Sequence, residues 1–249
     1  SKSYRGVVGI AGEINGKWNW ESGLLYSRSE TRDVDYKSVR ESRLRQALLR
    51  SDANAFNPFG YTFRVVGNQV QINQPYTNPA SVVDPLFDDF IRKGETEVAS
   101  WDAKISGPLV ELWRTPVSFA FGTEARFESY SDWRAPFAGL NPADSGLSPT
   151  DNDFVGFSPN INLNADRNVL SAYAEILVPI FGAHRRAPFF HALEFSAAGR
   201  YERFSDFGDA SKPKISVAWR PYRSVLLRAS YNESFRAPNL VQTNTQPLQ

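Results

Sequence analysis

Apolar and polar residues alternate along three consecutive runs between Phe190 and Pro238. Successive side chains of a β-strand point to opposite faces, so each run predicts a strand with one apolar and one polar face. Each run is roughly ten residues or longer, whereas strands in soluble sheets are mostly about five or six residues long. The polar faces also carry charges at strand centres, among them Glu194, Arg200 and Arg228. A soluble sheet with one wet face is the alternative, but strand length and charge favour a transmembrane β-barrel.

The same alternation predicts five more strands upstream of these runs. The first two form a hairpin around Asn15-Gly16, because Asn-Gly is the strongest short hairpin signal. The five runs span residues 4–13, 17–29, 95–107, 117–130 and 169–180. The whole chain is therefore expected to form about eight antiparallel strands.

The connections between these strands differ in length in an ordered way. Two are long, at about residues 31–94 and 131–167, residues 205–211 are intermediate, and the others are short. Alternate connections of an antiparallel sheet lie at opposite ends, so the long ones share one end and the short ones the other. Outer-membrane barrels have this arrangement, with short periplasmic turns and long extracellular loops.

Two local elements are expected inside the first long connection. Residues 39–50 have helical spacing of their apolar positions, and residues 63–72 predict a small hairpin around Gly67-Asn68. A connection of this length is uncommon in a compact soluble domain and is usually functional.

Composition narrows the function classes. The net charge is +1, which gives no electrostatic reason to expect a nucleic-acid partner. Cysteine is absent, which excludes disulfides, thiolate zinc sites and cysteine nucleophiles. No run of about 18 apolar residues is present, so no transmembrane helix is expected. Methionine is absent and no signal segment is visible. Both ends are therefore expected to be cuts within a longer protein. Residues 1–249 are expected to form one partial barrel domain.

Short motifs occur in order at strand and turn positions. They are RYE at 200–202, SDFG at 205–208, PK at 213–214, WRP at 219–221, LRASY at 227–231 and FRAPNL at 235–240, with NPFG at 57–60 and FGTEARFESY at 121–130 upstream. Through them the chain resembles the barrel of a TonB-dependent outer-membrane receptor. The motif positions singled out are Asn57, Pro58, Phe59, Gly60, Trp219, Arg220, Pro221, Phe235, Arg236, Ala237 and Pro238.

This resemblance implies a 22-stranded barrel whose lumen is filled by a plug, of which eight strands are roughly a third. It implies energised import of a scarce nutrient such as an iron–siderophore, cobalamin or a glycan. The implied partners are the lipid bilayer of a Gram-negative outer membrane, a plug domain and the TonB energising complex. The plug has no counterpart in this sequence. No cofactor is expected.

Charged residues on the predicted polar faces are the candidate lumen-facing positions. They are Glu124, Arg126, Glu128, Glu175, Arg200, Glu202 and Arg228. In a barrel they could face a plug or the path that it vacates. The alternative is that they pair with one another across neighbouring strands, each pair contributing about 0.2–1 kcal/mol. For any single residue, pairing is the preferred interpretation.

Catalytic signals are weak. His184, in a short turn, is expected to face solvent, and the acidic residues Asp84, Asp88 and Asp89 lack the spacing of a calcium loop and predict a solvated patch. Glu124 and Glu128 would lie ~13 Å apart on a strand, beyond the ~5–9.5 Å of a glycosidase pair. No enzyme and no metal site are expected. Two other functions stay open: a small self-closing barrel with a structural or adhesive role, and a soluble β-sandwich binding module.

Overall fold

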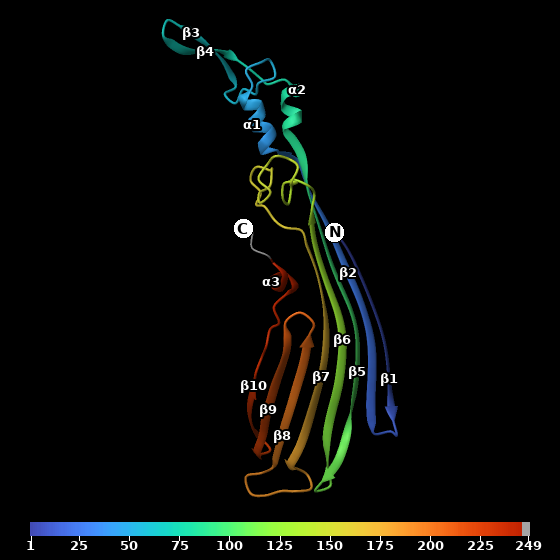
Figure 1. Ribbon diagram of the computed structural model, residues 1–249. Coiled ribbons are helices and arrows are strands. Elements are labelled where there is room, and N and C mark those ends of the chain that lie inside the picture. The colour runs from blue at the N-terminus through green and yellow to red at the C-terminus, as the bar shows by residue number, and fades with distance from the viewer. Residues whose placement is uncertain (246–249) are drawn as a thin grey trace. The chain divides into compact units, whose positions relative to one another are not determined.

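The computed structural model describes residues 1–245, and most of them lie in one eight-stranded sheet (Figure 1). Its strands, in spatial order, are β1 (Lys2–Ile14), β2 (Trp18–Val39), β5 (Phe87–Leu112), β6 (Thr115–Arg134), β7 (Leu163–Phe181), β8 (Ala192–Phe204), β9 (Gly208–Tyr222) and β10 (Val225–Asn232). Each strand thus pairs with the one that precedes it in the sheet, and β1 and β10 form the two edges. The expected all-β antiparallel architecture is confirmed.

The remaining elements are short. They are α1 (Glu41–Leu49), β3 (Tyr61–Val66), β4 (Gln69–Pro75), α2 (Ala80–Val83), the 3₁₀ turn η1 (Asp84–Leu86) and α3 (Leu240–Asn244). The expected helix at residues 39–50 is confirmed by α1, and the expected hairpin by the antiparallel pair β3–β4. No helix within residues 1–245 is long and apolar enough to cross a membrane.

Several strands extend beyond their alternating runs. β2 has 22 residues and β5 has 26, so the first long connection is shortened to residues 40–86. Likewise, the second runs only from 135 to 162, and the connection expected at 205–211 is the short turn 205–207 because β9 already begins at Gly208. The backbone ladder of a sheet does not require apolar side chains, so a strand can continue through residues that do not alternate. Hydrophobic periodicity therefore finds the centres of these strands and misses their ends.

Contacts divide the chain into two compact units. The sheet unit comprises residues 1–30, 95–130 and 164–245, and the loop unit comprises residues 31–94 and 131–163. The single domain over residues 1–249 stays a prediction.

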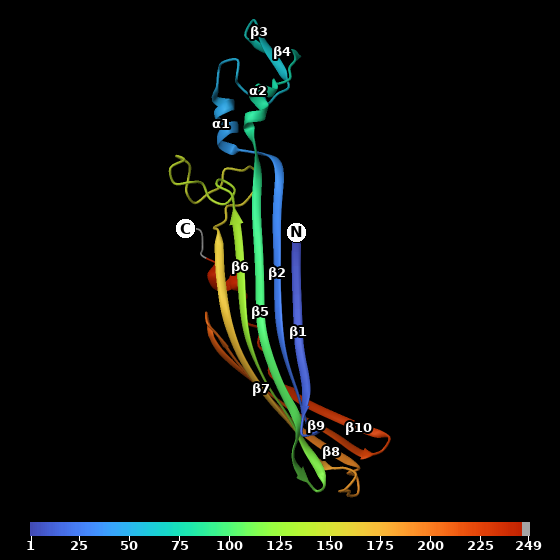
Figure 2. The same cartoon turned by 90° about the vertical axis from the view of Figure 1, so that its right-hand side faces the viewer.

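Strand register shows that the predicted faces are real. Leu193 is paired with Trp219, and Trp219 in turn with Leu227, so one face of β8, β9 and β10 is apolar. On the other face, Ser196 is paired with Ser216, and their hydroxyl oxygens lie 2.6 Å apart. The sheet twists strongly from β1 to β10, as Figure 2 shows, as long antiparallel sheets do.

The apolar face is not covered by the described residues. Val8, Leu24, Leu170 and Leu227 keep between 51% and 69% of their surface exposed. The only buried hydrophobic cluster recorded for residues 1–245 lies in the loop unit, where Phe90, Ala138 and Phe154 pack together. Exposed leucine and valine on a sheet with charges on its opposite face fit a surface that meets hydrocarbon.

Candidate functional site

A row of alternating charges crosses the polar face of the sheet unit. On β6, Arg126 donates through Nη1 to Glu124 Oε1 at 2.8 Å and through Nε to Glu128 Oε1 at 2.7 Å. Residues two apart on a strand share a face, so the sequence itself places these three side chains in contact. The arrangement leaves Glu124 Oε2 available to a second donor.

That second donor comes from β8. Arg200 Nη2 lies 3.2 Å from Glu124 Oε2 and 2.8 Å from Glu202 Oε1, so it bridges β6 and β8 over the intervening strand. Ser171 of β7 completes the connection, since its hydroxyl donates to Glu202 Oε1 at 3.3 Å. We call the row formed by Glu128, Arg126, Glu124, Arg200 and Glu202 the polar-face ladder.

Two other candidate positions lie on the same face outside the ladder. Glu175 of β7 is paired in register with Ala198, and Arg228 of β10 with Ala218. Neither forms an ion pair with another described residue. The structure thus brings five of the seven candidates together.

A glycine next to the ladder makes room for an aromatic ring. A Cβ atom at Gly122 of β6 would lie 2.3 Å from Tyr173 Cε1 on β7, so only glycine allows the tyrosine to lie flat there. The pattern of the sequence did not predict this pair. The available signal was Gly122 itself, near the middle of the alternating run at residues 117–130. A glycine inside a strand often marks a close approach by another group.

The ladder can interact with a partner. Its side chains keep between 21% and 41% of their surface exposed. Three carboxylates face two guanidinium groups, and Glu128 Oε2 and Glu202 Oε2 accept no hydrogen bond from the described residues. This row of charges has one negative charge in excess and spare acceptors, which suits a partner with cationic donors.

The SDFG and FRAPNL motifs meet in the sheet unit. Arg167 of β7 donates to both carboxylate oxygens of Asp206, at 2.8 and 2.6 Å, and its guanidinium lies 5.5 and 5.4 Å from the rings of Phe204 and Phe207. Phe207 in turn packs against Phe235 at 5.8 Å. These motif residues therefore hold the β8–β9 turn in place, which is a structural role.

The electrostatics of Asp206 follow from this packing. Burial opposes the charged form, but the hydrogen bonds and the positive charge of Arg167 outweigh it, so the pKa of Asp206 lies below its usual value. The hydroxyl of Thr243 in α3 also donates to this carboxylate, at 3.2 Å.

The other motif positions are near turns. Trp219 of β9 donates through Nε1 to the carbonyl of Phe189 at 2.9 Å, and Arg220 and Pro221 complete the WRP motif near the end of the strand. Residues 236–238 lie between β10 and α3.

In the loop unit, the NPFG motif forms the turn before β3. Asn57 Oδ1 accepts from the backbone amide of Phe59 at 2.9 Å, Pro58 lies between them, and Gly60 has a φ of +73°, which glycine adopts without strain.

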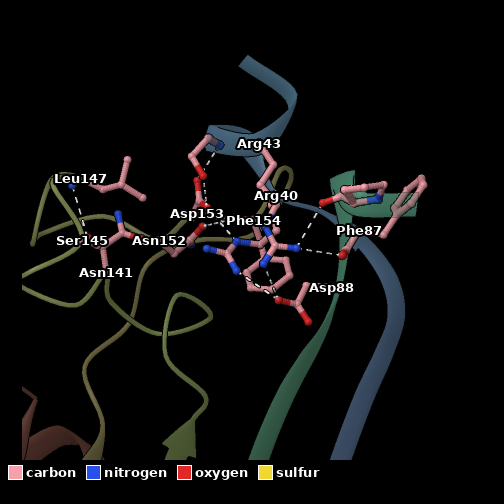
Figure 3. A network of polar contacts seen from close by, with 12 residues as sticks. Arg40, Arg43, Phe87, Asp88, Asn141, Ser145, Leu147, Asn152, Asp153 and Phe154 are labelled. Atoms are coloured by element: carbon pink, nitrogen blue, oxygen red, sulfur yellow. Dashed lines mark hydrogen bonds and ion pairs between the residues drawn. The ribbon is translucent and has the colours of Figure 1, made fainter. Parts of the chain in front are cut away.

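A buried charge network lies at the centre of the loop unit (Figure 3). Arg40 donates through Nε to Asp153 Oδ2 at 2.7 Å, and both side chains are almost fully buried. Asp153 also accepts from the amide and hydroxyl of Ser42, at 2.7 and 2.6 Å, at the N-terminus of α1. The guanidinium of Arg40 lies 4.0 Å from the ring of Phe137. The two long connections are thereby joined to each other.

Asp88 belongs to this network as well. It lies 3.2 Å from Arg40 Nη1 and 3.3 Å from Arg43 Nη2. Its side chain is nevertheless exposed, as are Asp84 and Asp89, in line with the expected solvated acidic patch. His184 is exposed in the β7–β8 turn. Within residues 1–245, no group of three or more histidine, cysteine, aspartate or glutamate side chains could hold a metal ion.

Comparison with protein families gives one match along nearly the whole chain. Residues 3–247 are similar to the family described as TonB dependent receptor-like, beta-barrel. Among curated proteins no match was found.

Proposed function

This chain belongs to the TonB-dependent receptor β-barrel family, and on that basis we propose that it forms part of the barrel wall of a receptor for energised nutrient uptake. Members of the family are receptor-type transporters of the Gram-negative outer membrane rather than enzymes. The proposed cargo is a scarce nutrient of the iron–siderophore, cobalamin or glycan type. The partners are the lipid bilayer, a plug domain and the TonB complex.

The observation that carries the proposal is the opposite chemistry of the two faces of one long sheet. The apolar face is exposed along its length, and charges on the other face pair into the polar-face ladder. Hydrocarbon cannot solvate charge, and Arg or Lys on a lipid-facing position costs ~2–4 kcal/mol at mid-depth. A barrel wall satisfies both faces, because it turns the ladder toward an enclosed, wet or plugged interior.

The open edges of the sheet support a barrel larger than eight strands. β1 and β10 are the outer strands in the sheet order and do not pair with each other. Unpaired strand edges need partners, and in a membrane they must be closed. A self-closing barrel of these eight strands is therefore not favoured. A sandwich would need a second large sheet facing the first, and the only other sheet within residues 1–245 is the β3–β4 hairpin.

Transport in cells tests the proposal. The full-length protein is produced in a Gram-negative host with and without the TonB energising protein, and uptake of labelled ferric siderophore, cobalamin and oligosaccharide is measured. We expect the protein in the outer-membrane fraction and uptake of one cargo class only when TonB is present. Recovery in the soluble fraction, or uptake that is equal without TonB, would contradict the proposal.

A further inference from the structure

The four short turns at one end of the sheet unit carry only positive charge, whereas the three-residue β8–β9 turn, which holds Asp206, lies at the opposite end. They are residues 15–17, 113–114, 182–191 and 223–224. Their charged residues are Lys17, Arg114, Arg185, Arg186 and Arg223, and no aspartate or glutamate lies among them. By contrast, the connection from 135 to 162 holds three aspartates and no lysine or arginine. Positive charge is therefore concentrated in the turns although the chain as a whole is nearly neutral.

These cations lie at one end of the sheet. Alternate connections of an antiparallel meander share an end, and the strand order places all four turns at the same one. Arg185 lies 4.0 Å from the ring of Trp113, which joins two of the turns, and the ring of Phe189 lies 5.8 Å from that of Tyr222, the β9 residue just before the turn at 223–224. Three of the four turns are therefore neighbours, and the turn at 15–17 shares their end of the sheet.

The charges on this surface are not neutralised within the protein. Lys17, Arg114, Arg186 and Arg223 are exposed, and none of the five cations forms an ion pair with another described residue. The nearby carboxylates of Glu13 and Glu194 are on the polar face of their strands, opposite the apolar face. A third, Glu111, is near the end of β5. Some arginines of the sheet, such as Arg126 and Arg167, do pair with carboxylates.

Aromatic side chains accompany the cations. Trp113, Phe189 and Tyr222 keep 48%, 61% and 54% of their surface exposed. Aromatic rings on membrane barrels gather where hydrocarbon gives way to headgroups. Adjacent lysine and arginine side chains reach outward from that level and can pair with phosphate groups.

We propose that the four short turns form a basic surface that binds anionic phospholipid headgroups in the adjoining membrane leaflet. This inference rests on the proposed function, since it requires the short turns to lie at a membrane surface. The aromatic rings favour a lipid surface over an acidic protein segment, because a protein partner would not need them at the level of the bilayer interface.

Lipid titration of the full-length protein in mild detergent tests the proposal. Native mass spectrometry measures the apparent Kd for phosphatidylglycerol and for phosphatidylcholine. We expect phosphatidylglycerol to bind at least about tenfold more tightly, with the preference falling as salt is raised. The fourfold variant Lys17→Gln/Arg114→Gln/Arg186→Gln/Arg223→Gln is expected to lose most of that preference. Arg185 is kept so that its stacking on Trp113 is preserved.

Two controls separate charge from structure. Replacing Arg32, Arg45, Arg50 and Arg64 of the loop unit with glutamine removes the same number of charges and is expected to leave the preference unchanged. The variant Arg114→Lys/Arg186→Lys/Arg223→Lys keeps the charge and is expected to keep the preference. Equal affinity of the wild type for both lipids, or an equal loss in the loop-unit control, would overturn the proposal. Tighter binding of polyglutamate than of phosphatidylglycerol would overturn it too, and would assign the surface to an acidic protein.

Failure of this inference can be told from failure of the proposed function. Outer-membrane fractionation and TonB-dependent uptake are measured on the same variants. A protein that transports normally without lipid preference refutes only the headgroup site. A protein that never reaches the membrane refutes the barrel itself and the headgroup site with it.

Discussion

The two units of this protein use the same chemistry, arginine paired with carboxylate, in opposite surroundings. In the loop unit, the side chains of Arg40 and Asp153 are 5% and 3% exposed. In the sheet unit, Arg126 and Glu124 of the polar-face ladder are 27% and 25% exposed. A buried pair cannot exchange its partner for water, whereas a pair whose side chains are about a quarter exposed can. The first therefore holds a fold together, and the second is available to another molecule.

The largest loss of stability is expected from Asp153→Asn in the loop unit. The change leaves the buried guanidinium of Arg40 without its main counter-charge, and Asp88, which is half exposed, is a poor substitute. Breaking a buried pair in this way costs about 3–5 kcal/mol. Hydrogen–deuterium exchange of the full-length protein should show faster exchange in α1 and residues 150–157, with the sheet unit unchanged.

An apolar replacement of the whole pair is the matched control. In Arg40→Met/Asp153→Leu no charge stays buried, so much of the lost protection should return. Slow exchange in the single Asp153→Asn variant would show that this pair does not hold the loop unit together.

An intermediate loss of stability is expected from Asp206→Asn in the sheet unit. Arg167 is 3% exposed but Asp206 is 16% exposed, so this pair lies between the other two in burial. Loss of its charge-assisted hydrogen bonds should cost about 1.5–3 kcal/mol at neutral pH. Heat stability followed by gel mobility of the folded barrel measures the difference.

The pH dependence of stability gives a second test of the Arg167–Asp206 pair. The pKa of Asp206 is depressed in the folded state, so its contribution is present above the unfolded value of about 4 and is lost as pH falls through the folded pKa. The stability difference between wild type and Asp206→Asn should therefore narrow below about pH 4. A difference that stays constant into acid would mean that the ionised carboxylate is not what stabilises the turn.

The sheet could be predicted from the sequence because its physics is local. An alternation such as that of Leu193, Phe195 and Ala197 needs only the two-residue period of a strand, and the register bears it out. The Arg126–Glu124 contact is also local, since both residues share a strand face. The bridge from Arg200 to Glu124 depends on β7 lying between β6 and β8. The alternation of residues within a strand does not predict such a contact between strands.

The loop unit could not be predicted in the same way. Arg40 and Asp153 are 113 positions apart, and their contact depends on how two irregular connections pack together. In the sheet unit, the packing of Tyr173 over Gly122 could not be predicted either, because it depends on the register between β6 and β7. Within the loop unit, only the helix α1 and the β3–β4 hairpin could be predicted, because the helix has its own apolar period and the hairpin its own turn residues.

The smallest effect on stability is expected from Glu124→Gln in the polar-face ladder. Its carboxylate binds both Arg126 and Arg200, yet all three side chains contact water, so the loss should be at most about 1 kcal/mol. Glutamine keeps the shape and one acceptor, and Glu128 and Glu202 still pair with the two arginines. If the ladder serves a partner in the barrel interior, this variant should nonetheless lower transport by more than its small change in heat stability explains. Glu41→Gln, which removes an exposed pair with Arg45 in the loop unit, is the control that should change neither. A loss of stability as large as that of Asp153→Asn would show that the ladder, despite its exposure, is a structural support of the sheet.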